Sequence, residues 1–294
     1  MDLFIQQFVA GLATGGIYAS IALALVMIYQ AIHHINFAQG EMAMFSTYVA
    51  WTMINAGMPY WLAFSLTVII SFIGGLLIER LIIRPVEDAP VLSLIIVTLG
   101  LLVIFNSVAG WIWTYTLKPF PSPFPAQPLK LMGNTTIRMH DAGAIVVTLA
   151  LMLLLYLFFR FTPLGLAMRA SAQNPESSRL VGIRVGLMLA LGWGLAAAIG
   201  AVAGMMVAPI VFLDPSMMAM IMLYGFAAAL LGGVSSPGGA VVGGFIVGVL
   251  ENLAATYIPF VGNELKLVVA LVIIVVVVIV RPSGLFGKVL VTRV

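Results

Sequence analysis

The chain has 294 residues, of which 63% are hydrophobic and 8% are charged, with a net charge of +3 at pH 7. Charged residues make up about 25% of soluble domains, so this composition excludes a soluble protein and indicates an integral membrane protein. The lack of cysteine excludes disulfides and thiolate metal sites. In a membrane protein, the small positive charge reports chain orientation before any affinity for nucleic acid.

Nine apolar segments predict an all-α, polytopic bundle of about 8–9 transmembrane helices, some of them broken or re-entrant. We expect the helices to form one transmembrane domain over residues 1–294. The first segment is too long for a signal-peptide core and follows no basic region, so no cleavable signal is predicted. In chain order the segments are 4–29, 41–56, 61–78, 91–113, 142–159, 188–212, 217–232, 237–256 and 265–280.

Two interruptions do not fit ordinary spans. Residues 28–41 are polar without Lys or Arg, and they form either a short cytoplasmic turn or a break at membrane depth. Such a break is tolerated only inside protein or beside a water-filled cavity. Residues 231–239 are rich in glycine, and the short apolar runs around them fit either two short helices or a re-entrant pair.

The segment 114–141 holds five prolines between residues 119 and 128. Closely spaced prolines cannot form a helix and favour an extended chain. We expect either an ordered surface connection or part of a docking surface for an external partner.

The polar, basic segment 160–187 lies between two long apolar runs and holds four of the thirteen Lys and Arg residues. Asn174 supplies an N-cap, Pro175 suits the first helical position, and Glu176 places an acid in the first turn. Gly182 lies where such a helix should end. We therefore predict a short capped helix outside the membrane that serves as a handle for another protein.

The distribution of cationic residues predicts the orientation. Nine of them fall in 79–90, 160–187 and the C-terminal tail, which the positive-inside rule places in the cytoplasm. Four fall on the opposite side, which includes the segment 114–141 and, by counting spans, the N-terminus. The nine are Arg80, Arg84, Arg160, Arg169, Arg179, Arg184, Arg281, Lys288 and Arg293; the four are Lys118, Lys130, Arg138 and Lys266.

No residue pattern typical of an enzyme is present. His33 and His34 are adjacent, so they face different sides of a helix and are poor joint metal ligands. No glycine-rich loop ending in GK[ST] is present to bind ATP. We therefore expect no catalytic residue, no metal and no cofactor in this chain.

Polar side chains within apolar spans are costly and call for a functional hypothesis. Asn36, Gln39 and Glu41 cluster at the first interruption, where they either cap and connect broken helix ends or border a translocation path. Glu251 and Asn252 lie near the end of a span, where snorkelling or helix capping would account for them.

Small residues recur at four-residue spacing, which lets helix backbones approach closely. The pattern predicts a tightly packed bundle and leaves open whether the partner helices belong to this chain. The sets are Gly11/Gly15, Ala196/Gly200/Gly204, Gly239/Gly243 and Gly244/Gly248.

Several motifs resemble those of LivH-type branched-chain amino-acid ABC permeases, in order along nearly the whole chain. Residues 36–42, Asn-Phe-Ala-Gln-Gly-Glu-Met, are similar to an NFAHGE-type segment of that family. Residues 79–85 resemble its ER-x3-RP loop, and residues 162–176 resemble its cytoplasmic signature. Residues 231–244 and 281–287 are similar to its last segments.

The resemblance implies a single permease domain of type II ABC importer-like fold in the bacterial inner membrane. The implied partners are a second, LivM-like permease, two cytoplasmic ATPase subunits that bind the ATP, and a periplasmic substrate-binding protein. The family's coupling helix has an EAA-x3-G pattern, which residues 176–182 match with serines replacing both alanines. The implied ATPase-coupling helix consists of Asn174, Pro175, Glu176, Ser177, Ser178, Arg179 and Gly182.

The substrate follows only from the resemblance, which implies branched-chain or similar apolar amino acids. Another small solute, such as urea, a short amide or another amino acid, remains an alternative, because specificity is expected to reside in the binding protein. An ion-coupled secondary transporter is a rival of another class. It would need a relay of ionisable intramembrane residues, of which this chain has few.

Overall fold

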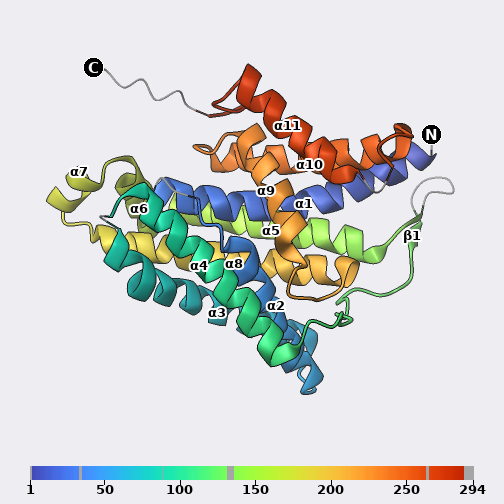
Figure 1. Ribbon diagram of the computed structural model, residues 1–294, viewed down its shortest axis with the longest axis horizontal. Helices are drawn as coiled ribbons and strands as arrows, with labels where there is room; N and C mark the ends of the chain where they lie inside the picture. Colours follow the sequence, from blue (N-terminus) through green and yellow to red (C-terminus); the bar gives the residue numbers. More distant parts are fainter. Residues whose placement is uncertain (1, 33–34, 88, 131–135, 263–264, 288–294) are drawn as a thin grey trace. The chain divides into compact units, whose positions relative to one another are not determined.

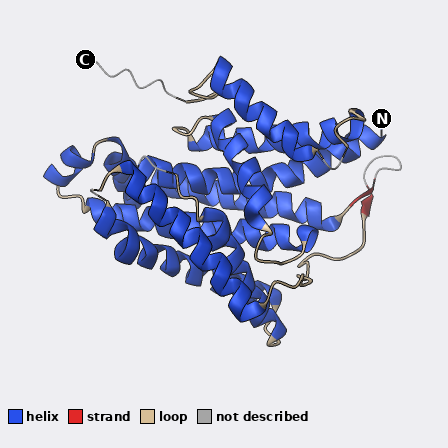
Figure 2. Ribbon diagram, viewed as in Figure 1, coloured by secondary structure: helices blue, strands red, loops and turns tan. Residues whose placement is uncertain are grey.

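The computed structural model describes residues 2–32, 35–87, 89–130, 136–262 and 265–287. Predictions that concern His33, His34, Lys288 and Arg293 lie outside these residues. Within the described ranges the regular secondary structure is helical apart from one antiparallel pair of short strands (Figure 1), and Figure 2 shows how little strand there is. The expectation of an all-α protein is therefore confirmed.

Each of the nine predicted apolar segments corresponds to a helix, with boundaries that differ by only a few residues. Two further α-helices, α6 and α7, lie in the segment 160–187. The elements are α1 (Asp2–Ile32), α2 (Gln39–Asn55), α3 (Tyr60–Ile78), the π-helix η1 (Glu79–Ile83), the 3-10 helix η2 (Arg84–Val86), α4 (Val91–Trp113), β1 (Leu129–Lys130), β2 (Thr136–Ile137), α5 (Met139–Phe161), α6 (Pro163–Gln173), α7 (Pro175–Leu180), α8 (Val185–Val211), α9 (Met218–Gly232), α10 (Pro237–Tyr257) and α11 (Lys266–Val280).

Six helical stretches among the described residues are long and apolar enough to cross a membrane. They are Leu3–Gln30, Tyr60–Val86, Val91–Trp113, Met139–Phe161, Val185–Val211 and Pro237–Tyr257. The apolar helices α9 and α11 have 15 residues each and are shorter than a typical span. The structure therefore supports a multi-pass membrane protein, while a count of eight to nine spans stays a prediction.

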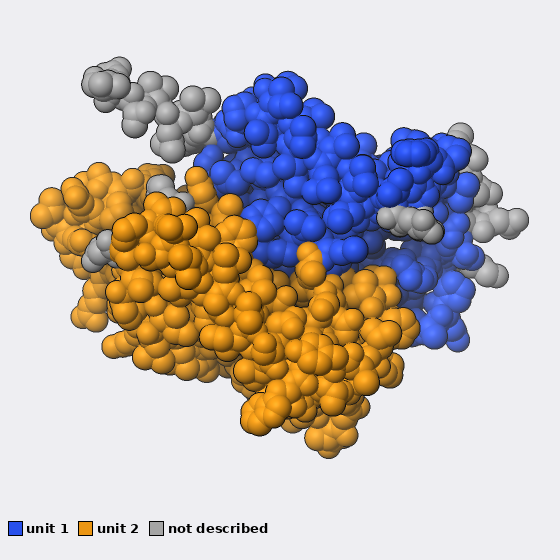
Figure 3. Space-filling view, in the orientation of Figure 1, with its two compact units in different colours: residues 1–26, 122–148, 220–294 blue, residues 27–121, 149–219 orange. Residues whose placement is uncertain are grey.

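The chain forms two compact units, which Figure 3 shows in two colours. Unit 1 consists of residues 1–26, 122–148 and 220–294, and unit 2 of residues 27–121 and 149–219. In unit 1, α1 and α10 touch backbone to backbone through the predicted small residues. A β-carbon at Gly15 would lie 2.9 Å from the Gly244 carbonyl oxygen, so only glycine fits.

In unit 2, α8 is the central helix and packs most extensively against α3 and α2. A β-carbon at Gly75 of α3 would lie 2.5 Å from the Trp193 carbonyl oxygen, and one at Gly204 would lie 2.8 Å from the Ala43 carbonyl oxygen. These contacts confirm the tight packing that the small-residue spacing predicts.

The two ends of α8 carry different segments of unit 2. Its 27 residues make it about 40 Å long. After its last turn, Leu213 exchanges two backbone hydrogen bonds of 2.9 Å with Lys118, which anchors the proline-rich segment there. Before its first turn lies α7. The segments 114–121 and 160–187 are therefore at opposite ends of α8, as the predicted topology requires.

Three helices begin with the same local signal, a polar cap followed by proline at the first helical position. Thr162 accepts a hydrogen bond from the Gly165 amide at 3.0 Å at the start of α6, and Asn174 caps α7 in the same way. Ser236 accepts from the Gly239 amide at 3.1 Å at the start of α10. The cap at Ser236 explains why the second interruption separates two helices, α9 and α10.

Candidate functional site

The predicted short helix in the segment 160–187 is present as α7, which projects beyond its neighbours in unit 2 at the left of Figure 1. The Asn174 Oδ1 accepts a hydrogen bond from the Ser177 amide at 2.9 Å, as an N-cap should. Pro175 occupies the first helical position, and Glu176 lies exposed in the first turn. This carboxylate stabilises the helix because it faces the positive end of the helix dipole.

The end of α7 is fixed by a Schellman motif centred on Gly182, whose φ is 84°. The Gly182 amide donates to the Arg179 carbonyl oxygen at 3.1 Å, and the Ile183 amide donates to the Ser178 carbonyl oxygen at 3.0 Å. A left-handed φ of this kind strongly favours glycine. Both ends of the short helix are therefore determined by single residues.

Most of the surface of α7 faces away from the rest of unit 2. Leu180 and Val181 are 87% and 76% exposed, and Ser177 and Arg179 are also exposed. Ser178 is buried, so it contributes to packing rather than to the outer face. Two uncovered apolar side chains next to a cation form a surface that another protein could cover.

The helix α6 escapes prediction, although it carries a signal that could have found it. Thr162 and Pro163 repeat the cap-and-proline pattern of α7. α6 helps to enclose a small pocket in unit 2, and the hydroxyl of its buried lining residue Ser171 has no hydrogen-bond partner among the described residues. The pocket is lined by Met27, Gln30, Phe159, Met168, Arg169, Ser171, Ala172, Met188, Leu189 and Gly192.

Asn36 and Gln39 are fully buried at the start of α2, where they make local and tertiary hydrogen bonds. The Asn36 Oδ1 accepts from the Ala38 amide at 3.0 Å, which stabilises a turn within the first interruption. The Gln39 Nε2 donates to the Ala196 carbonyl oxygen at 2.9 Å and so ties α2 to α8. These bonds match the interpretation in which both residues cap and connect helix ends.

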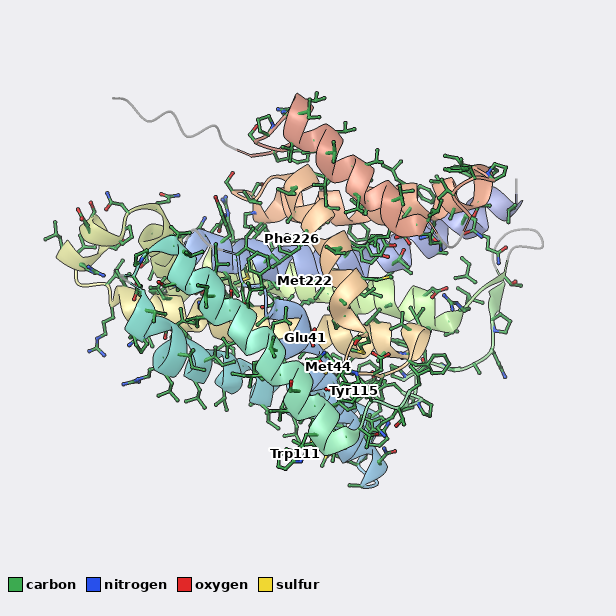
Figure 4. The ribbon with its side chains drawn as sticks, viewed as in Figure 1. Glu41, Met44, Trp111, Tyr115, Met222 and Phe226 are labelled. Carbon is green, nitrogen blue, oxygen red and sulfur yellow. The ribbon has the colours of Figure 1, made fainter. Side chains whose placement is uncertain are left out.

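Glu41 is buried on α2 one turn before Met44 (Figure 4). Its Oε2 lies 3.4 Å from the Asn106 Nδ2, which donates a shorter bond of 2.7 Å to the Pro215 carbonyl oxygen. Asn106 therefore belongs chiefly to Pro215, and Glu41 has only one long hydrogen bond among the described side chains. Of the three predicted path residues, Glu41 has the least hydrogen bonding and stays the best candidate for contact with a permeating solute.

Glu251 is not explained by snorkelling, because its side chain is only 4% exposed. Its Oε2 accepts a hydrogen bond of 2.7 Å from the Tyr18 hydroxyl, which joins α10 to α1 in unit 1. Asn252 donates to Thr14 on the same pair of helices at 2.9 Å. Sequence reasoning could not find these partners, since Tyr18 lies 233 positions away.

Among the described residues, no group of three or more His, Cys, Asp or Glu side chains could hold a metal ion. The adjacent His33 and His34 lie outside the described residues.

The sequence matches the family model described as "Branched-chain amino acid transport system / permease component" over residues 7–278. The chain belongs to this family. A permease component is a transport subunit and not an enzyme. The match to the family model confirms the resemblance to branched-chain amino-acid permeases.

The curated relatives are permeases of the same kind. The chain is 32% identical over 306 residues to "High-affinity branched-chain amino acid transport system permease protein LivH" of Salmonella typhimurium, which covers 99% of this chain and 98% of that protein. It is 30% identical to the corresponding BraD of Pseudomonas aeruginosa, with the same coverage. The solved structure "PsaBC from Streptococcus pneumoniae in complex with Fab" aligns with 96% of this chain and 91% of that chain, at 13% identity and a TM-score of 0.47.

Proposed function

We propose that this permease subunit carries branched-chain amino acids across the inner membrane as part of an ABC importer. The observation that carries the proposal is the similarity, over 99% of the chain, to permeases named for branched-chain amino-acid transport. The partners are a second, LivM-like permease, two cytoplasmic ATPase subunits that bind ATP, and a periplasmic substrate-binding protein. The fold is of the type II importer kind.

In this account α7 is the coupling helix that receives movements of the ATPase. The capped start at Asn174, the fixed end at Gly182 and the exposed Leu180 and Val181 support this role. A helix of six residues is only marginally stable alone, so its caps and a partner surface together keep it ordered. The segments 79–90 and 160–187 lie in the cytoplasm, and the segment 114–141 lies outside.

The translocation path passes Glu41, with Asn36 and Gln39 supporting the backbone beside it. An amino acid that a binding protein delivers needs no tight membrane site, so few polar groups suffice. The single long hydrogen bond that Glu41 makes among the described side chains supports this assignment.

Uptake of labelled amino acids tests the substrate. The complete complex is reconstituted in vesicles with ATP and the binding protein, and leucine, isoleucine and valine are compared with urea, acetamide and polar amino acids. We expect uptake of the three branched-chain amino acids only, and none with an ATPase subunit that cannot hydrolyse ATP. Selective uptake of urea or an amide would contradict the proposed substrate. Uptake without ATP would contradict an ATP-driven mechanism.

Cross-linking tests the coupling helix. Ser177→Cys places an exposed thiol on α7 in a chain that has no other cysteine. We expect it to cross-link to the ATPase subunit, while Ser122→Cys in the proline-rich segment does not. Failure of the Ser177→Cys cross-link in an intact complex would remove α7 from the ATPase interface.

A further inference from the structure

An ion pair follows the last residue of α3 in unit 2. Glu79 begins the π-helix η1 with a side chain that is 2% exposed, and Arg84 follows η1. The Arg84 Nε and Nη2 lie 3.2 and 3.1 Å from the Glu79 Oε1, and Nη2 lies 3.0 Å from Oε2. The planar guanidinium thus binds the carboxylate through two nitrogens, a geometry that lysine cannot reproduce.

The π-helix is what brings these two residues together. The Arg84 amide donates to the Glu79 carbonyl oxygen, which is the i+5 to i bond of a π-turn. Backbone and side chain therefore both join Arg84 to Glu79. Single π-turns within helices are frequent at functional sites, because they realign the side chains that follow.

Arg84 also reaches a third element. Its Nη2 donates to the Gly186 carbonyl oxygen at 2.7 Å, in the first turn of α8. Gly186 leaves room for this approach, because a β-carbon there would lie 3.3 Å from the same nitrogen. One side chain therefore connects the end of α3 with the beginning of α8.

The beginning of α8 is joined to α7 by a short, hydrogen-bonded path. The Ile183 amide is bonded to Ser178 of α7, and the Val185 amide donates to the Ile183 carbonyl oxygen at 3.0 Å. Gly186 is the next residue. A displacement of α7 would therefore also move Gly186, and through the hydrogen bond to Gly186 it would move Arg84.

We propose that Arg84 is a positioning residue for energy coupling, which transmits movements of α7 to α3 through Gly186. The inference rests on the coupling role proposed for α7. A simpler role, in which Arg84 only neutralises the buried Glu79, predicts a loss of stability alone when the pair is removed. Coupling adds a loss of transport per ATP that remains when no unpaired charge is left buried.

Three variants separate these roles. Glu79→Gln/Arg84→Gln removes both charges, so no buried carboxylate loses its partner. Arg84→Lys keeps a charge beside Glu79, but a single ammonium cannot hold both the carboxylate and Gly186 in the same geometry. Arg80→Gln is the matched control, because Arg80 is an exposed cation in the same π-helix.

The measurement is substrate transported per ATP hydrolysed by the complete complex in proteoliposomes, together with membrane abundance and thermal unfolding. We expect the double variant to assemble, to hydrolyse ATP and to transport at least about fivefold less per ATP, the lower end of typical coupling between sites. Arg84→Lys should show the same direction, and Arg80→Gln should match the wild type.

A normal ratio in the assembled double variant overturns the inference. If that variant does not assemble, Arg84→Lys decides: a normal ratio overturns the inference and a reduced one supports it. The wild-type complex reports separately on the proposed function. If the wild type takes up no branched-chain amino acid, the proposed function is contradicted. If the wild type takes up these amino acids and the variants transport as much per ATP, only the proposed role of Arg84 is contradicted.

Discussion

At the scale of single residues, each end of α7 depends on one residue. Asn174 satisfies an amide at the start, and Gly182 supplies the left-handed backbone at the end. A β-carbon at Gly182 would have no neighbouring atom within 4 Å beyond the adjacent residues of the chain. A substitution at Gly182 therefore acts chiefly through the left-handed backbone, so it tests whether coupling depends on the direction in which the chain leaves α7.

We expect Gly182→Val to leave the protein in the membrane and to lower transport per ATP, because valine disfavours the left-handed φ by about 1–2 kcal/mol. Gly57→Val is the matched control, because Gly57 also has a positive φ, 92°, and equally open surroundings. Gly57 lies in the connection between α2 and α3, which is not part of the segment 160–187. Transport per ATP in reconstituted complexes, corrected for abundance, checks the prediction. Equal coupling in both variants would show that α7 needs no fixed end.

The buried Glu251 gives a second residue-scale prediction, which concerns stability. Tyr18→Phe removes the hydroxyl that donates to the Glu251 carboxylate. Loss of one partner of a buried hydrogen bond should lower the stability by about 1–3 kcal/mol. Thermal unfolding in detergent measures the change, and Tyr18→Phe/Glu251→Leu should recover part of it because no polar group is then left alone. A Tyr18→Phe protein as stable as the wild type would contradict the prediction.

At the scale of helices, the contact between α3 and α8 depends on which glycine faces the partner. Gly75 faces Trp193 of α8, whereas the neighbouring Gly74 faces open space. We expect Gly75→Val to lower the stability by about 1–3 kcal/mol, the usual cost of overpacking, and Gly74→Val to change it little. Both variants place the same side chain on the same helix, so a difference between their unfolding temperatures reports the effect of position alone. Equal losses would mean that helix propensity, and not packing, decides.

The sequence could predict the helices better than their contacts. A buried or membrane-embedded helix needs a continuous apolar run, so nine segments were visible from composition. α6 has no such run, because polar residues such as Arg169 and Gln173 interrupt its sequence. Only the Thr162-Pro163 pattern at its start indicates a helix. The partners of Glu251 and Arg84 come from distant positions, and residue spacing within one segment carries no information about them.

For the candidate site, residues with local roles were predictable and those with distant partners were not. Asn174 and Gly182 act on their own helix, so their pattern was sufficient. Gln39 bonds Ala196, and this tertiary bond is what separates it from the poorly bonded Glu41 nearby. Residue spacing alone therefore could not distinguish Gln39 from Glu41.

At the scale of the whole molecule, the charge distribution predicts which side of the membrane each loop faces. The excess of cationic residues predicts that residue 177 is inside and residue 122 outside. In intact cells, or in spheroplasts where an outer membrane is present, an impermeant thiol reagent should label Ser122→Cys and not Ser177→Cys. The chain has no cysteine, so the unsubstituted protein should give no signal. Both sites are exposed, so the reverse pattern would invert the orientation.

Because of the glycine contacts along α8, a rotation of this helix would move both of its ends and the helices packed against it. At about 40 Å, a rotation of about ten degrees around its middle would shift each end by about 3.5 Å, in opposite directions. Gly75 and Gly204 bring the backbones of α3 and α2 close against α8, so these contacts leave little room for the helices to slide. The three helices would tilt as one body. A small rotation near Gly186 would then produce a displacement in the opposite direction beside Leu213, at the other end of α8.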